Sequence, residues 1–176
     1  MIEDMNKCAS LASDENLKNG IELYEKLTKE NKDPLQVMLD MQKKLQDNVA
    51  ELMPENGNIA PDKLETLGQI YDWLRDNKLA LDDEFREVID ALPGCNLDAK
   101  SRSGIFKKWK KNHMTLRNKK LSELTPEEYK ELKFEIIDAW HFFMNMFIAL
   151  RLDAKEIFCY YYLKNHENFR RYQNNY

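Results

Sequence analysis

Apolar residues along most of this chain recur every three or four positions, which is the spacing of one face of an α-helix. Asp33-Pro34 is typical of a helix start, with Asp as the N-cap and Pro in the first turn, and PENGN at 54–58 predicts its end. Pro61-Asp62 predicts a second helix, and the stretch 81–92 a third that Pro93-Gly94 stops. The apolar stripes of the first two helices are Leu35, Met38, Leu45, Val49 and Leu52, and then Leu64, Leu67, Ile70, Tyr71 and Leu74.

The second half of the chain continues the same pattern. A basic helix is expected from about 106 to 121, followed at 125–128 by TPEE, a capping box that begins a long helix to about Leu150. DAKE at 153–156 repeats this signal before a last helix. No segment alternates apolar and polar residues for long enough to predict a strand. The sequence therefore predicts an all-α fold, an antiparallel helical bundle in a single domain over residues 1–176.

Composition narrows the class of protein. The chain has 176 residues, 43% of them hydrophobic, and a net charge of −4, which gives no general attraction to nucleic acid. The N-terminal residues lack the basic start and apolar run of a signal peptide, and the longest apolar run is too short to cross a membrane. That run, AWHFFMNMFIAL, is also interrupted by His141 and Asn145. We expect a protein of the cytoplasm, without direct contact to nucleic acid or membrane.

Two of the predicted helices carry paired carboxylates at the same position relative to their apolar stripes. LDDEFREVIDAL from Leu81 and LKFEIIDAWHFF from Leu132 align Glu84 with Glu135 and Glu87 with Asp138. None of the four acids has Lys or Arg four residues away, where surface helices often place one. The apolar positions expected to be buried beside them are Leu81, Phe85, Val88 and Leu92 on one helix and Leu132, Ile136, Ala139 and Phe143 on the other.

Two interpretations of the four acids remain open at this point. Most Asp and Glu on helix flanks are simply solvated. If the two helices pack together, however, four carboxylates would share one cleft. Such a cleft could bind Mg²⁺, because this hard cation takes carboxylate oxygens as ligands together with substrate phosphates. The glycine motifs that cradle phosphates are absent. A rival function is a helical nucleic-acid-binding or protein-interaction module that uses the basic helix at 106–120, with Trp109 stacking on bases.

The motifs together resemble a known family. E-x-x-E in DEFRE, E-x-x-D in KFEIIDAWHF, the intervening FKKWKK and the closing YYYLKNHENFRRYQNNY are similar to the all-α dimeric dUTPase superfamily, which is related to the MazG-type nucleoside triphosphate pyrophosphohydrolases. DPLQVMLDMQ, PDKLET, DDEFRE and YYLKNHENF resemble its bacteriophage members in particular. The resemblance covers nearly the whole chain beyond about Asp33.

The resemblance implies an activity and a set of partners. A homodimer would hydrolyse dCTP to dCMP and diphosphate, and dUTP to dUMP, and would also act on the diphosphates dCDP and dUDP. Two or more Mg²⁺ ions would serve each site. The reaction would clear dCTP from the pool used for phage DNA synthesis in the cytoplasm of the infected bacterial host. There the enzyme could associate with other phage enzymes of nucleotide synthesis.

The resemblance also assigns roles to residues, by matching position. The four metal ligands are Glu84, Glu87, Glu135 and Asp138, of which Glu84 or Glu87 is the catalytic base. The phosphate-binding residues are Lys107, Lys110, Lys164, Asn168, Arg171 and Tyr176, with 168–176 a mobile tail that closes over the phosphates. Gln42, Gln46 and Trp109 contact the base. Gln46 replaces an Asn of uracil-restricted relatives, and its longer amide could serve cytosine as well as uracil.

Overall fold

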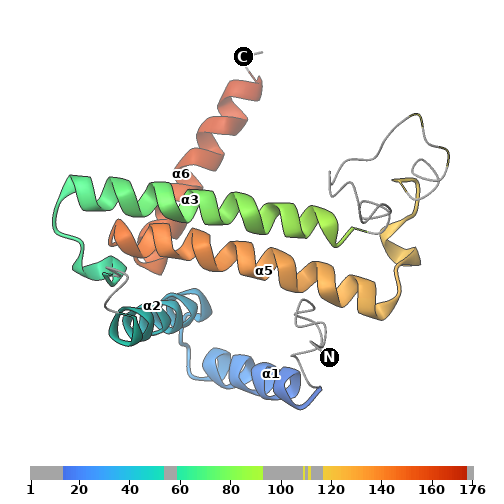
Figure 1. Cartoon of the computed structure of the whole chain (residues 1–176), viewed down its shortest axis with the longest axis horizontal. Coiled ribbons are helices and arrows are strands. Elements are labelled where there is room, and N and C mark those ends of the chain that lie inside the picture. The colour runs from blue at the N-terminus through green and yellow to red at the C-terminus, as the bar shows by residue number, and fades with distance from the viewer. Residues whose placement is uncertain (1–13, 54–58, 93–108, 110, 112–116, 174–176) are drawn as a thin grey trace. The chain divides into compact units, whose positions relative to one another are not determined.

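The computed structural model describes residues 14–53, 59–92, 109, 111 and 117–173, and every regular element in these ranges is helical (Figure 1). The elements are α1 (Asp14–Lys29), α2 (Pro34–Leu52), the 3₁₀ turn η3 (Pro61–Lys63), α3 (Leu67–Asp90), the 3₁₀ turn η4 (Leu121–Glu123), α5 (Pro126–Ala149) and α6 (Ala154–Gln173). The predicted all-α fold class is confirmed. No described helix has the length and apolar character needed to cross a membrane.

The predicted helix starts are built by local capping contacts. The Asp33 carboxylate accepts a hydrogen bond from the backbone N–H of Leu35 at 2.9 Å at the start of α2. Thr125 and Glu128 form the reciprocal bonds of a capping box before α5, at 2.9 and 3.1 Å. Asp153 and Glu156 do the same before α6, at 3.2 and 2.8 Å. These three starts are confirmed, because each depends only on residues within one helical turn.

The predicted boundary between the second and third helices is wrong. Pro61-Asp62 opens only the short turn η3, and α3 then runs without interruption from Leu67 to Asp90. Thr66 and Gln69 cap this helix, since the Gln69 side chain accepts from the Thr66 N–H and the Thr66 hydroxyl accepts from the Gln69 N–H. Arg151 holds the preceding turn in place by donating to the Pro61 and Leu64 carbonyl oxygens at 2.5 and 2.7 Å.

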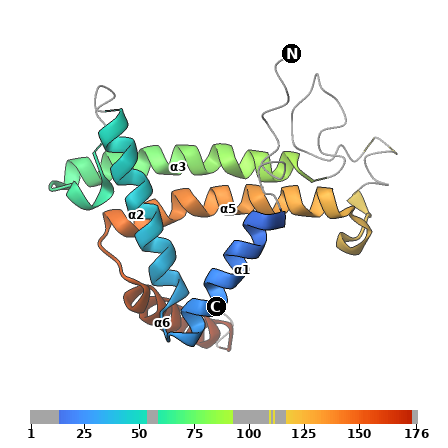
Figure 2. The same cartoon turned by 90° about the horizontal axis from the view of Figure 1, so that it is seen from below.

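The chain forms two compact units, each built from two segments. The first unit contains residues 1–21 and 76–143, and the second contains residues 22–75 and 144–176. In the first unit, the 76–90 part of α3 and the 126–143 part of α5 lie side by side (Figures 1 and 2). In the second unit, α2 contacts η3 and α6. The Gln36 side chain on α2 also accepts a hydrogen bond from the Ala154 N–H, the first residue of α6, at 3.0 Å.

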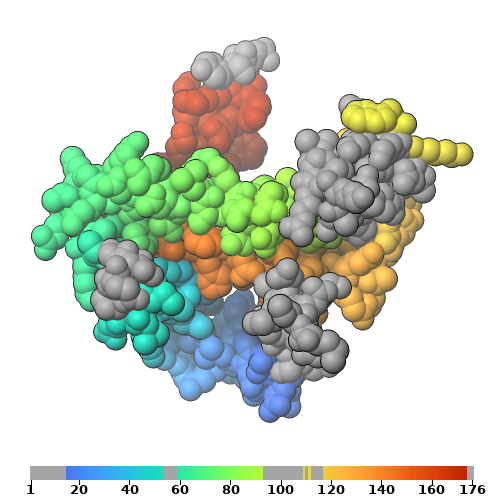
Figure 3. Space-filling model, viewed as in Figure 1, coloured from blue at the N-terminus to red at the C-terminus, as the bar shows by residue number. Residues whose placement is uncertain are grey.

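Burial in the first unit differs from the sequence expectation. Ala139 is buried, but Phe85, Ile136 and Phe143 are 51%, 44% and 39% exposed, while the acid Glu135 is only 5% exposed. The side-by-side contact of two helices covers a narrower strip than the full apolar stripe of each, and Glu135 lies in that strip. Both helix segments reach the surface in the space-filling view (Figure 3).

Candidate active site

Three carboxylates from two helices meet in the first unit. Glu84 lies on α3, and Glu135 and Asp138 lie one turn apart on α5. Each of the three offers an oxygen atom, and these oxygens all lie within 4.8 Å of one another. Residues separated by some fifty positions in the sequence are therefore brought together, as the matched spacing of the two helices predicted.

Glu135 is the most buried member of this carboxylate cluster. Its Oε2 atom is buried and has no hydrogen-bond partner among the residues that the structure describes. Burial is the largest cause of a rise in the pKa of the Glu135 carboxyl to about 7, and the negative charges of Glu87, Glu131, Asp138 and Glu84 contribute to the same rise in that order of importance. A buried acid without a partner destabilises the folded chain unless something neutralises it.

Glu84 shares this environment to a lesser degree. Burial raises the pKa of its carboxyl above the usual range, and the charges of Glu87 and Asp138 add to the effect. Within the described part of the chain, no Lys or Arg forms an ion pair with Glu84 or Glu135. The nearby Arg86 instead donates to Asp83 at 2.7 Å.

Glu87 lies at the edge of the cluster and outside the group of three. Its side chain is half exposed, and its Oε1 atom lies 3.7 Å from Arg86 Nη2. Its charge nevertheless raises the pKa of both Glu84 and Glu135. The structure thus brings three of the four predicted ligands together and leaves the fourth beside them, open to water.

The donor set fits a hard divalent cation. All the candidate ligands are carboxylate oxygens, which Mg²⁺ prefers, and the unpartnered Oε2 atom of Glu135 supplies the uncompensated charge that a cation would neutralise. Clusters of acids on a solvated surface lack this feature, because water pairs with their oxygens. The burial of Glu135 therefore distinguishes this cluster from solvated helix flanks.

The residues expected to contact the base lie in different environments. Gln42 and Gln46 are one turn apart on α2, as predicted, with Gln42 only 3% exposed and Gln46 half-buried. Gln42 Nε2 donates to Asn145 Oδ1 on α5 at 2.8 Å. Trp109 is 81% exposed. Of the three, Gln42 is held by a specific buried partner.

The expected phosphate-binding residues lie on the exposed end of α6 where they are described. Lys164, Asn168 and Arg171 are exposed, and Arg171 Nε donates to Glu167 Oε1 at 3.0 Å. Arg170 and Arg171 hold the pKa of the Glu167 carboxyl at about 2. Helix α6 continues to Gln173, so most of the tail predicted at 168–176 is helical here. Lys107, Lys110 and Tyr176 lie outside the described residues, as does most of the basic stretch 106–120.

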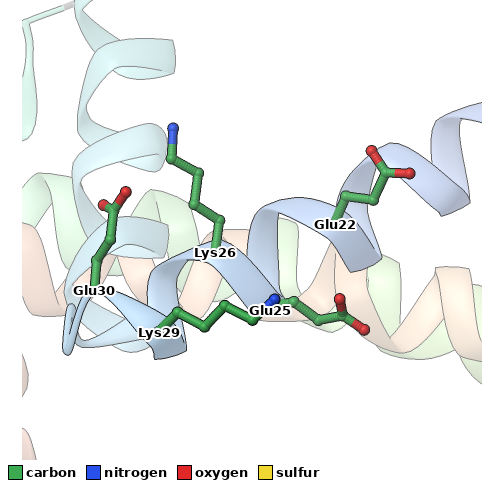
Figure 4. Close-up of a pocket in the computed structure, with 5 residues that line it drawn as sticks. All are labelled: Glu22, Glu25, Lys26, Lys29 and Glu30. Atoms are coloured by element: carbon green, nitrogen blue, oxygen red, sulfur yellow. The ribbon is translucent and has the colours of Figure 1, made fainter.

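A separate pocket beside the end of α1 contains none of the expected site residues. It is lined by Glu22, Glu25, Lys26, Lys29 and Glu30 (Figure 4). Acidic and basic side chains are mixed along it, which is typical of a solvated helix surface. This pocket adds nothing to the candidate site.

Sequence reasoning missed one buried polar network in the second unit. Asn145 is 3% exposed, its side chain accepts from Gln42, and its backbone oxygen accepts from Trp73 Nε1 at 3.3 Å. The signal was visible, since Asn145 interrupts the apolar run AWHFFMNMFIAL. A polar residue in such a run needs a hydrogen-bond partner once it is buried.

Known proteins with similar sequences cover almost the whole chain. The chain is 46% identical to the dCTP pyrophosphatase of Enterobacteria phage LZ5 over 171 residues, which cover 97% of this chain and 98% of that protein. It is 42% identical to the dCTP pyrophosphatase of Enterobacteria phage T4, with the same coverage. It is also 42% identical over 160 residues to a phage T4 protein named DNA replication protein, and this match covers 91% of the chain but 40% of that protein.

No protein-family profile and no solved structure matches the chain. The similarity to two pyrophosphatases along their full length does not favour the alternative of a nucleic-acid-binding or protein-interaction module. It agrees with the resemblance of the E-x-x-E and E-x-x-D motifs and with the carboxylate cluster that they form. The chain therefore belongs to the dCTP pyrophosphatase family of T-even-type phages.

Proposed function

We propose that this protein is a magnesium-dependent pyrophosphohydrolase that converts dCTP to dCMP and diphosphate. The observation that carries the proposal is the buried, unpartnered Oε2 atom of Glu135 within a cluster of three carboxylates. The similarity to phage dCTP pyrophosphatases over 97% of the chain supports the choice of substrate. The proposal extends to dUTP, which yields dUMP, and to dCDP and dUDP.

The carboxylate cluster would hold the metal. Glu84, Glu135 and Asp138 are the central ligands, with Glu87 completing the set from its edge, and two or more Mg²⁺ ions would share these oxygens. When bound, Mg²⁺ would neutralise negative charge that develops on the phosphate oxygens. Glu84 or Glu87 would act as the general base that takes a proton from the attacking water. Glu87 is half exposed and so reaches water directly, whereas burial and the neighbouring acids raise the pKa of Glu84 above its ordinary value.

Other residues of the chain would bind the rest of the nucleotide. Gln42 and Gln46, together with the exposed Trp109, are proposed to contact the pyrimidine. Positive side chains, with neutral hydrogen-bond donors beside them, would hold the phosphates, because charge-assisted hydrogen bonds to phosphate are strong. This set contains Lys164, Asn168 and Arg171 on α6 and, outside the described residues, Lys107, Lys110 and Tyr176. The end of the chain, residues 168–176, would order over the bound triphosphate.

The proposed assembly is a homodimer. Large apolar side chains that a single chain leaves exposed support it, among them Phe85, Ile136 and Phe143 in the first unit. Helix α6 alone exposes Phe158, Tyr160, Tyr161, Tyr162, Leu163, Phe169 and Tyr172. Such exposure is typical of a surface that another protein covers. The enzyme would act in the cytoplasm of the infected bacterium, removing dCTP during phage DNA synthesis and acting beside other enzymes of nucleotide synthesis.

Product analysis tests the proposal directly. The protein would be incubated with each common deoxynucleoside triphosphate, with Mg²⁺ or with a chelator, and the products separated by ion-exchange chromatography. We expect dCMP and diphosphate from dCTP only when Mg²⁺ is present, and no turnover by Glu135→Gln. Release of single phosphate from dCTP, or equal turnover in the chelator, would contradict the proposed reaction.

A further inference from the structure

The buried contact between Gln42 and Asn145 joins two helices through a single pair of amides. Gln42 lies on α2 and Asn145 on α5, 103 positions apart in the sequence, and both side chains are 3% exposed. The bond from Gln42 Nε2 to Asn145 Oδ1 measures 2.8 Å, within the usual range for a good N–H···O bond. Most buried side-chain amides bond to backbone or water, so this pair is a specific arrangement.

Asn145 is itself fixed from a second direction. The indole N–H of Trp73 donates to the backbone oxygen of Asn145 at 3.3 Å, and α5 supplies the helical frame around it. The partner of Gln42 is therefore attached to a rigid element. The Trp73 contact fixes the backbone of Asn145, and the orientation of the Gln42 amide then depends on the bond between the two side chains.

The direction of a glutamine amide decides which base edge it can pair with. One end of the amide donates and the other accepts, so a rotation of half a turn exchanges the two. Cytosine presents an amino donor where uracil presents a carbonyl acceptor. A buried hydrogen bond that opposes this rotation is therefore a means of discrimination between the two pyrimidines.

We infer that Asn145 is a positioning residue that fixes the amide of Gln42 and thereby sets the preference between dCTP and dUTP. The inference rests on the proposed function, in which Gln42 contacts the pyrimidine. Asn145 acts only through Gln42 in this scheme. Loss of the Asn145 side chain therefore changes the ratio of the two activities and does not simply lower both.

A double-mutant cycle on the full-length protein tests the inference. Asn145→Leu keeps the branched shape of the side chain and removes its hydrogen bonds, and Gln42→Met keeps the unbranched shape of the partner and removes its amide. The measured quantity is the ratio of kcat/KM for dCTP to kcat/KM for dUTP. We expect Asn145→Leu to change this ratio by about five-fold, the effect of one net hydrogen bond. In the Gln42→Met background, the same substitution should change it by less than about two-fold.

Two further proteins complete the experiment. Asn77→Leu removes a buried amide from α3 and serves as the matched control, which should keep the wild-type ratio. If Asn145→Leu fails to fold in circular dichroism, Asn145→Ser replaces it, because the shorter side chain also loses the contact to Gln42. An equal loss of both activities, an equal ratio change in both backgrounds, or a similar ratio change in Asn77→Leu would overturn the inference. Absence of metal-dependent dCTP turnover in the wild type would instead refute the proposed function.

Discussion

Replacement of Glu135 by Gln should stabilise the metal-free protein. Burial and four neighbouring acids raise the pKa of this carboxyl from its ordinary value of 4.5 to about 7. Each unit of difference between the two pKa values corresponds to about 1.4 kcal/mol. The ionised carboxylate therefore destabilises the folded state by about 3 kcal/mol above pH 7. Gln has nearly the same volume and no charge. We therefore expect the free energy of unfolding to rise in Glu135→Gln by up to about 3 kcal/mol at pH 8.

The gain should depend on pH in a defined direction. Because the pKa of Glu135 is higher in the folded than in the unfolded chain, the folded state binds more protons between pH 4.5 and about 7. Its contribution to stability is fully present below pH 4.5 and is lost as the pH rises to about 7. The difference between Glu135→Gln and wild type should therefore be near zero at pH 4.5 and largest at pH 8.

Urea denaturation in the presence of a chelator measures this difference. Wild type and variant would be unfolded at several pH values and one fixed protein concentration, because association with a second chain would also contribute to stability. Glu65→Gln is the matched control, since Glu65 is exposed and forms no ion pair in the described part of the chain. A gain that is equal at pH 5 and pH 8, or the same gain in Glu65→Gln, would refute the reasoning. Added Mg²⁺ should stabilise wild type more than Glu135→Gln.

Four other outcomes are expected. Glu84→Gln should keep the circular dichroism spectrum and lower kcat for dCTP by orders of magnitude, and near-normal turnover would contradict its place in the cluster. Gln46→Asn should lower kcat/KM for dCTP more than for dUTP, whereas equal losses would remove Gln46 from base selection. Deletion of 168–176 should leave Mg²⁺ binding nearly unchanged by calorimetry but sharply lower kcat/KM for dCTP, and full activity would show that this end is dispensable. In urea denaturation, Arg151→Ala should lower the free energy of unfolding by about 2 kcal/mol, because its bonds to Pro61 and Leu64 are lost. The control Arg75→Ala loses only a surface ion pair to Asp72 and should lower it by less than about 1 kcal/mol.

The sequence by itself determined the features that depend on neighbours within one helical turn. The caps at Asp33, Thr125 and Asp153 predicted helix starts that the structure confirms. The matched E-x-x-E and E-x-x-D spacings predicted that acids from two helices would meet, and three of the four do so. Helix α1 was missed, although Ser13 followed by Asp14 and Glu15 is a typical start signal and Leu17, Ile21 and Tyr24 have helical spacing.

Only the tertiary structure decided which of these residues are buried and what they contact. The four acids have similar local patterns, yet Glu135 is buried, Glu84 and Asp138 are partly buried, and Glu87 is exposed. The difference arises because burial depends on the packing of α3 against α5 in the first unit. Two hydrogen bonds join residues that are ninety or more positions apart in the chain. Gln42 donates to Asn145, and Arg151 donates to the backbone oxygen of Pro61. The periodicity of a sequence shows which face of a helix is apolar. It does not show which element packs on that face, or which charged or amide side chain becomes buried there, because those contacts join residues far apart in the chain.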